Sequence, residues 1–125
     1  MNKYCIGITV AVLLSGTLLA DELSLEELRE RSRDCALFDD EGSYSGDALG
    51  ILWGDFDIVF DCAPPGRSEK QRFSIYVVIN ENGEVSQATV VPESEAAQCI
   101  EEKARSRVFP KPPFADYVLG VSVNL

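Results

Sequence analysis

The sequence feature that most constrains this chain is a hairpin pattern in its last third. Residues 73–79 alternate apolar side chains with others, as a half-buried strand does, and residues 85–91 return as a partner strand. Between them stands Asn82-Gly83, the strongest short hairpin signal, because a type I′ turn needs positive φ at both central residues. We therefore expect an antiparallel pair of strands joined by a type I′ turn.

The residues after the hairpin predict one helix and one more strand. Glu93 to Val108 is helical in pattern: Ser94 can cap it, acidic residues come early and basic residues come late, which suits the helix dipole. The prolines that follow prevent the helix from continuing and favour an extended passage: Pro110, Pro112 and Pro113. Residues 117–125 alternate again. The order is strand, strand, helix, strand.

The first half of the chain is less regular. Residues 23–38 predict a helix, because Ser24 and Glu27 form a capping box and one apolar stripe has helical spacing. The stripe favours packing on the core over an amphipathic partner-binding helix. Residues 39–46 predict an acidic loop, whose spacing does not fit a calcium site. Residues 47–61 fit a helix or a strand, and the alternation over 55–61 favours a strand there.

Composition excludes several functions. The chain has 21 acidic and 11 basic residues and no histidine. The acidic surplus argues against binding nucleic acid or an anionic membrane, which need clustered cations. Without histidine, the chain lacks the usual general base and the commonest metal ligand. We expect no enzyme activity, cofactor or metal site. Paired carboxylates such as Asp55 and Asp57 are the only acid–base alternative, and on a strand they would share a solvent-exposed face.

The first twenty residues predict a signal peptide, because Lys3 precedes an apolar run too short to span a bilayer. We expect cleavage before Asp21, with an uncleaved anchor as the alternative, and a periplasmic or secreted protein. Cleavage removes Cys5 and leaves Cys35, Cys62 and Cys99, which an oxidising compartment would pair. Three pairings are possible: 35–62, 35–99 and 62–99.

Short motifs in the second half resemble the TonB C-terminal domain, in particular its cysteine-containing branch in gliding-motility and related envelope proteins. The matches are the N-E-N-G-E-V turn at 80–85, Cys99-Ile100 in the helix, Phe109-Pro110 with the following Lys-Pro, and the alternating final strand. The resemblance covers residues 62–125 and implies an α+β fold: a small antiparallel sheet with a helix packed across one face. Residues 55–125 would form this domain, preceded by an N-terminal helix and acidic loop over 21–54.

The resemblance also implies a disulfide and a binding site. In that branch a cysteine ahead of the hairpin accompanies the one in the helix, which favours the pair Cys62–Cys99 and leaves Cys35 as a buried small residue or an intermolecular thiol. TonB domains bind an extended peptide of an envelope protein at the sheet edge, by β-strand addition. In this chain that edge would be the final strand, with these partner-binding residues: Tyr117, Val118, Leu119, Val121 and Val123. A disulfide-braced structural or inhibitor-like protein using the acidic face over 39–61 is the alternative.

Overall fold

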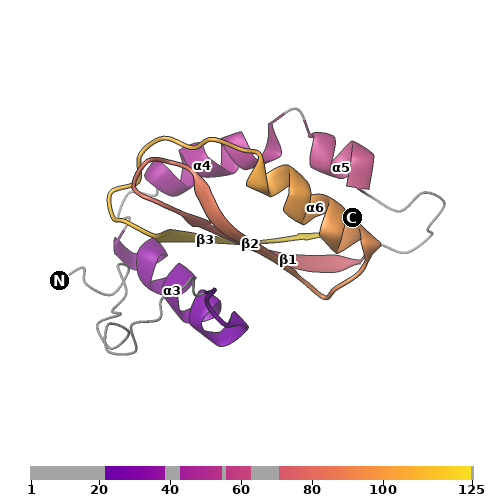
Figure 1. Ribbon diagram of the computed structural model, residues 1–125, viewed down its shortest axis with the longest axis horizontal. Helices are drawn as coiled ribbons and strands as arrows, with labels where there is room; N and C mark the ends of the chain where they lie inside the picture. The colour runs from indigo at the N-terminus through magenta and orange to yellow at the C-terminus, as the bar shows by residue number, and fades with distance from the viewer. Residues whose placement is uncertain (1–21, 39–42, 55, 63–70, 125) are drawn as a thin grey trace.

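An antiparallel sheet of three strands, in the order β2-β1-β3, lies at the centre of the molecule (Figure 1). Strand β1 spans Arg72–Ile79, β2 spans Val85–Val91 and β3 spans Tyr117–Asn124, so the three predicted strands are confirmed. The apolar composition of β1 suits its central position, because a neighbouring strand on each side shields it from water. One face of β1 is fully buried through four side chains: Phe73, Ile75, Val77 and Ile79.

The computed structural model describes residues 22–38, 43–54, 56–62 and 71–124. The predicted signal peptide, its cleavage site and Cys5 lie outside the described residues. Within the described ranges, no helix is long and apolar enough to cross a membrane.

The β1–β2 hairpin is confirmed, but its predicted turn type is wrong. Within this turn, Gly83 alone has a positive φ, of 89°, and its N–H donates to the Asn80 carbonyl at 2.9 Å. The Asn80 side-chain oxygen accepts the N–H groups of Asn82 and Glu84, each at 2.9 Å. The pairing register also shifts between Val78 and Ile79. This arrangement is a longer turn with a bulge and a glycine in the left-handed region, and the side chain of Asn80 hydrogen-bonds the backbone within it.

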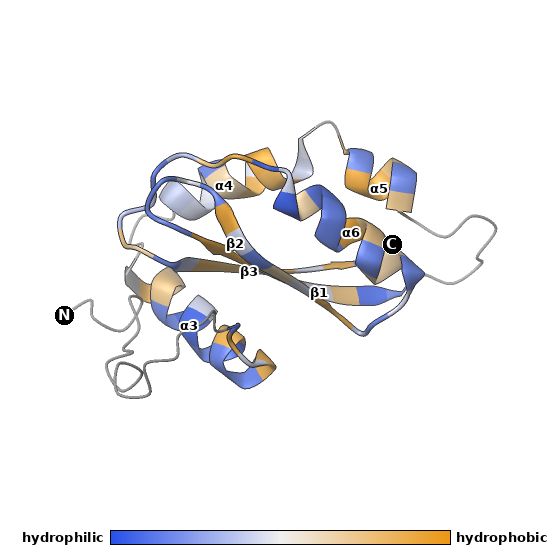
Figure 2. Cartoon of the chain, in the orientation of Figure 1, coloured by the Kyte–Doolittle hydropathy of each residue, from blue (hydrophilic) through white to orange (hydrophobic). Residues whose placement is uncertain are grey.

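Helices cover both faces of the sheet (Figure 1). Helix α3 (Leu25–Phe38) packs on one face, while α4 (Ser43–Trp53), α5 (Asp57–Cys62) and α6 (Glu95–Arg105) lie on the other. Polar and apolar residues alternate along the ribbons of α3 and α6, as in amphipathic helices with one buried side (Figure 2). The α+β class is therefore confirmed. The sheet carries helices on two faces, whereas the expected core had one helix on one face.

Helix α3 begins at the predicted capping box. The Glu27 N–H donates to the Ser24 hydroxyl at 3.2 Å, and the Ser24 N–H donates to the Glu27 carboxylate at 2.9 Å. Leu28 and Cys35 on its inner side are fully buried. Ahead of the helix, the Gln87 side chain bonds both the N–H and the carbonyl of Leu23, which fixes the entry of α3 over β2. The predicted core-packing helix is confirmed.

The predictions for the segment between α3 and β1 are wrong. Residues 43–46 belong to α4 and not to a loop, and residues 57–61 lie in α5 and not in a strand; Asp55 lies outside the described residues. The buried positions are four apart: Ala48 and Leu52 in α4, and Ile58 and Cys62 in α5. That spacing belongs to a helix. The alternation that favoured a strand came from Phe56, Ile58 and Phe60, and of these only Ile58 is buried.

Helix α6 packs on β2 and matches the prediction in type. The Ser94 hydroxyl caps it by accepting the Ala97 N–H at 3.0 Å. The helix ends at Arg105, three residues short of the predicted end, so that Arg107 leaves the helix and turns toward α5. Its buried residues join α3, α4, α5 and the sheet in a single hydrophobic core.

Candidate partner-binding edge of the sheet

Strand β3 forms one edge of the sheet, because among the strands of the sheet it pairs only with β1. In an antiparallel pair, alternate residues direct both N–H and C=O toward the partner strand, and the residues between them direct both away. The N–H of Val118 donates to the sulfur of Cys35 on α3 at 3.4 Å, so Val118 is one of the outward residues. By alternation, Gly120, Ser122 and Asn124 are outward too.

The second half of this edge is open. Gly120, Ser122 and Asn124 are exposed, and their outward backbone groups make no hydrogen bond within the described part of the chain. Between Tyr117 and Asn124 the strand carries no charged side chain. Proteins usually blunt exposed edges with charges, prolines or bulges, because open backbone groups attract further strands. Residues 120–124 lack each of these protections.

The opposite edge, on β2, is covered at Ala88 and Val90, which are buried. Ile75 of β1 lies opposite both Val90 and Val121, and Val121 is an inward residue of β3. Val90 must therefore direct its N–H away from the sheet, and that N–H donates to the Glu101 carboxylate on α6 at 2.9 Å. The agreement of Val90 and Val118 fixes the same hydrogen-bond phase from both edges. Of the two edges of the sheet, β3 is therefore the one that offers open backbone groups.

The predicted partner-binding residues occupy two different environments. Tyr117, Val118 and Leu119 are buried and belong to the core. Val121 and Val123 are half-buried, on the face opposite α3. The outward residues that the open edge presents were missed, although the same alternation that identified the strand also implies a second set of positions: Gly120, Ser122 and Asn124.

Close packing of α3 explains where the open edge begins. A Cβ atom added at Gly120 would lie 3.0 Å from the Ser32 Cβ and 3.1 Å from a ring carbon of Tyr76. Real Cβ atoms rarely approach that closely, so the glycine lets α3 cross the strand at this point. Helix α3 thus covers the start of the β3 edge, through Cys35, and leaves the end of it exposed.

The first residue of β3 anchors the strand to α4 and to the proline-rich segment. The rings of Tyr44 and Tyr117 meet edge-on at 4.8 Å between centroids, and the Tyr117 hydroxyl bonds the Ser45 hydroxyl at 2.8 Å. The Tyr44 hydroxyl donates to the Pro110 carbonyl at 2.7 Å. Burial, followed by the proximity of Tyr117, raises the pKa of Tyr44 to about 12. The start of β3 is therefore held firmly, which keeps the open end in position.

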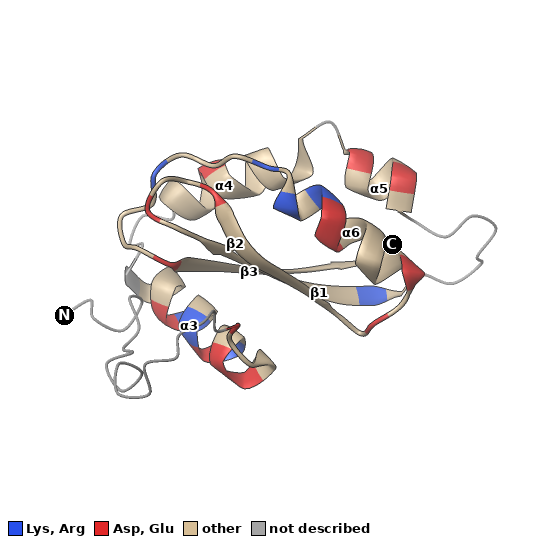
Figure 3. Ribbon diagram, viewed as in Figure 1, with Lys and Arg blue, Asp and Glu red and all other residues tan. Residues whose placement is uncertain are grey.

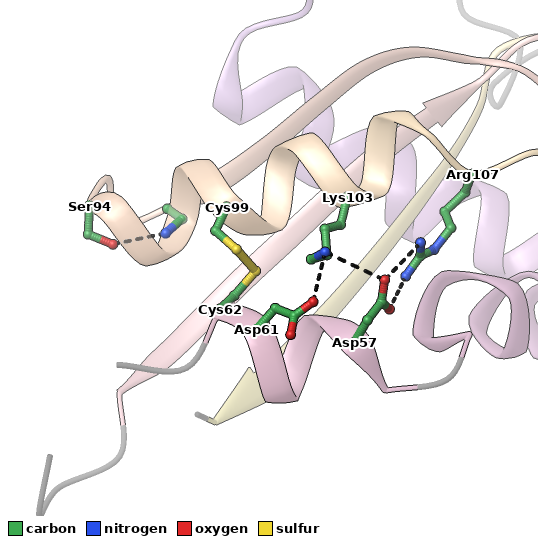
Figure 4. The surroundings of a disulfide bond; sticks show 8 residues. Asp57, Asp61, Cys62, Ser94, Cys99, Lys103 and Arg107 are labelled. Atoms are coloured by element: carbon green, nitrogen blue, oxygen red, sulfur yellow. Dashed lines mark hydrogen bonds and ion pairs between the residues drawn. A yellow bond between two sulfur atoms is a disulfide. The ribbon is translucent and has the colours of Figure 1, made fainter. Parts of the chain in front are cut away.

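Helix α5 is clamped to α6 by a disulfide and by ion pairs (Figure 4). Cys62 and Cys99 form the disulfide expected from the resemblance, with Cα atoms 5.5 Å apart. The Arg107 guanidinium forms an ion pair with Asp57, in which one nitrogen lies 2.6 Å from a carboxylate oxygen. It also donates to the Leu52 carbonyl at 3.0 Å. Lys103 pairs with Asp61 at 3.0 Å. These contacts join the end of α4, all of α5 and the end of α6.

The same contacts change the interpretation of the acidic residues. Hydrogen bonding from Arg107, together with the charges of Arg107 and Lys103, holds the pKa of Asp57 below its usual range. A carboxylate held ionised in this way makes a poor general acid. Asp57 and Asp61 serve as partners of α6 and not as a purely negative face.

Cys35 is fully buried, as the helix stripe predicts. The interpretation of Cys35 as a leftover thiol is wrong, because none of the three described cysteines is a free thiol.

Among the described residues, no group of three or more His, Cys, Asp or Glu side chains could hold a metal ion. Comparison of the chain with protein-family models, curated proteins and solved structures finds no match. The candidate site therefore stands on the geometry of the β3 edge.

Proposed function

We propose that the chain is a protein-interaction module of the cell envelope that binds an extended segment of a partner protein by strand addition at β3. The observation that carries this proposal is the asymmetry of the sheet. At the β2 edge the outward residues Ala88 and Val90 are buried and the Val90 N–H is bonded to Glu101, whereas residues 120–124 of β3 present unbonded, uncharged backbone within the described part of the chain. An added strand would complete those hydrogen bonds, as in other β-augmentation complexes.

The resemblance to the TonB C-terminal domain supports the same mode of binding, because that family works by accepting a peptide at a sheet edge. The apolar first twenty residues and the Cys62–Cys99 disulfide favour an oxidising compartment such as the periplasm. The incoming segment would place apolar side chains beside Val121 and Val123, and small or polar side chains beside Ser122. Alternation of this kind is the sequence preference that we expect in the partner.

The test uses proline at two neighbouring positions. Ser122→Pro removes only an outward N–H, which an edge strand tolerates, whereas Val121→Pro removes a ladder hydrogen bond to β1 and should weaken the fold. Wild type and Ser122→Ala should recover the same envelope protein on affinity purification from envelope extract. Ser122→Pro should fold with an unchanged circular dichroism spectrum and lose that protein.

Two outcomes contradict strand addition. One is recovery of the same protein by Ser122→Pro. The other is a bound protein that is released by raising the salt concentration to about 0.5 M, because main-chain pairing is far less sensitive to screening than contact through an acidic face.

A further inference from the structure

Two exposed prolines, Pro110 and Pro113, stand in the connection between α6 and β3. Helix α6 ends at Arg105, ahead of both, so neither proline is needed to stop it. Because both side chains are exposed, burial in the core does not select them either. Their rings are therefore available to a second molecule.

The sequence from Phe109 to Pro113 restricts the backbone to the polyproline II region. Each proline fixes its own φ at about −65°, and each residue that precedes a proline is driven to β or polyproline II values. These two restrictions together act on all five residues, since Pro110, Pro112 and Pro113 follow one another so closely. A polyproline II helix has about three residues per turn, so side chains three positions apart share an edge.

Burial along the segment follows this period of three. Phe109 is 3% exposed and Pro112 is half-buried, so their edge faces the molecule. Pro110 and Pro113 form a second edge and Lys111 stands on the third, and all three residues are exposed. The segment therefore presents two proline rings on one edge, one turn apart, with a lysine on the neighbouring edge.

The segment is held in place from the side of the molecule. The Phe109 N–H donates to the Gly83 carbonyl at 2.8 Å, and the Pro110 carbonyl accepts the Tyr44 hydroxyl at 2.7 Å. The connection runs along α4, the helix that carries Tyr44 (Figure 1). Within the described residues, no hydrogen bond reaches the carbonyls of Lys111 and Pro112. A ligand that is fixed in advance avoids the ordering cost that a flexible one incurs on binding.

Lys111 is the charged group of this surface. It forms no ion pair within the described part of the chain. Between Arg107 and Phe114 the connection carries basic residues and no acidic ones (Figure 3). Glu84 of the hairpin turn accepts a hydrogen bond from the Asn80 amide at 3.3 Å and does not pair with Lys111. The ammonium group of Lys111 is therefore available to a carboxylate of another protein.

We propose that residues 110–113 form a polyproline II ligand, distinct from the β3 edge, for a protein whose groove is lined by aromatic side chains and bordered by a carboxylate. Aromatic grooves accept proline rings three positions apart, and the proline backbone is already ordered before binding. Tyrosine and tryptophan side chains in such a groove can donate to the open carbonyls of Lys111 and Pro112. Strand addition is closed to this segment, because proline has no N–H to complete a ladder.

The test titrates the folded chain with a panel of purified SH3 and WW domains, which read polyproline II ligands through aromatic grooves. We expect at least one domain to bind the wild type, and to bind Pro110→Ala/Pro113→Ala at least about tenfold more weakly. Pro112→Ala is the matched control, because it removes a proline from the edge that faces the molecule, and its affinity should stay nearly unchanged. Lys111→Gln should weaken binding at about 0.02 M sodium chloride, and the difference should shrink at about 0.5 M.

A measurement without substitutions completes the test. In NMR spectra of the wild type, the amide signals of Lys111 and Phe114 should shift on binding, and that of Gly120 should not. The proposal is overturned if no domain binds, if Pro112→Ala loses as much affinity as the double variant, or if the shifts are confined to β3. Full affinity of Lys111→Gln would overturn the carboxylate border of the groove. Ser122→Pro should bind the domains normally, because this ligand does not depend on strand addition at β3.

Discussion

At the scale of single residues, two glycines give opposite expectations for the same substitution. Gly83 has a φ of 89°, and a Cβ atom there would collide with the carbonyl oxygen of Phe109. The N–H of Phe109 donates to the Gly83 carbonyl at 2.8 Å. Gly83→Ala should therefore lower the free energy of unfolding by about 2–4 kcal/mol in urea denaturation. The clash is with backbone, so the turn cannot relax around it without losing that hydrogen bond.

Gly50 is the matched control for this experiment. It lies within α4 and is exposed, and a Cβ atom there would meet nothing within 4 Å. Gly50→Ala should raise the free energy of unfolding by roughly 0.5–1 kcal/mol, because alanine loses less backbone entropy in a helix. A neutral or favourable effect of Gly83→Ala would mean that the turn differs from the one described.

Sequence reasoning succeeds where local chemistry decides the structure. Ser24 and Ser94 are caps that the sequence predicts, since a cap depends on residues three positions away. It fails where distant contacts decide. Residues 57–61 alternate like a strand, but Arg107, fifty residues later, holds Asp57 in a helix. The covered start of the β3 edge likewise depends on Cys35 and Val118, which are 83 residues apart.

At the scale of elements, α5 depends on its disulfide more than on its own sequence. The Cys62–Cys99 bond spans a separation of 37 residues. Replacing both cysteines by serine should cost about 3–4 kcal/mol in the chain-entropy model and release α5 from α6. Urea denaturation measures the loss, and faster amide hydrogen exchange in residues 57–62 than in β1 would locate it.

Two checks separate the disulfide from the ion pairs beside it. Reduction of the wild type should cause at least this loss, because it also breaks the bond of Cys35. If the double serine variant loses less than about 1 kcal/mol, the packing of Ile58 and the contacts of Arg107 and Lys103 are sufficient to hold α5.

At the scale of the whole molecule, net charge should oppose folding. The formal charge is -10, and within the described residues the cations near the end of α6 are already used in local pairs. Raising sodium chloride from about 0.02 M to about 0.2 M should stabilise the fold by on the order of 1 kcal/mol, because screening relieves the long-range repulsion. Potassium chloride should act equally. Destabilisation by salt would mean that the local pairs outweigh the repulsion.

Acid should act on the whole molecule through the contact of Asp57 with Arg107. This contact lowers the folded-state pKa of Asp57 below its unfolded value of about 3.9. The unfolded chain therefore takes up the proton first as pH falls, so the stabilisation is complete above about pH 4 to 5 and is lost as pH falls through the folded-state pKa.

Comparison of the wild type with Asp57→Asn isolates this carboxylate from the other acidic groups. The wild type should be the more stable at about pH 7, and the difference should shrink below about pH 4. A difference that stays constant from neutral to acid pH would show that Asp57 acts by packing and not through its charge, and α5 would then be held to α6 by the disulfide and the Lys103–Asp61 ion pair.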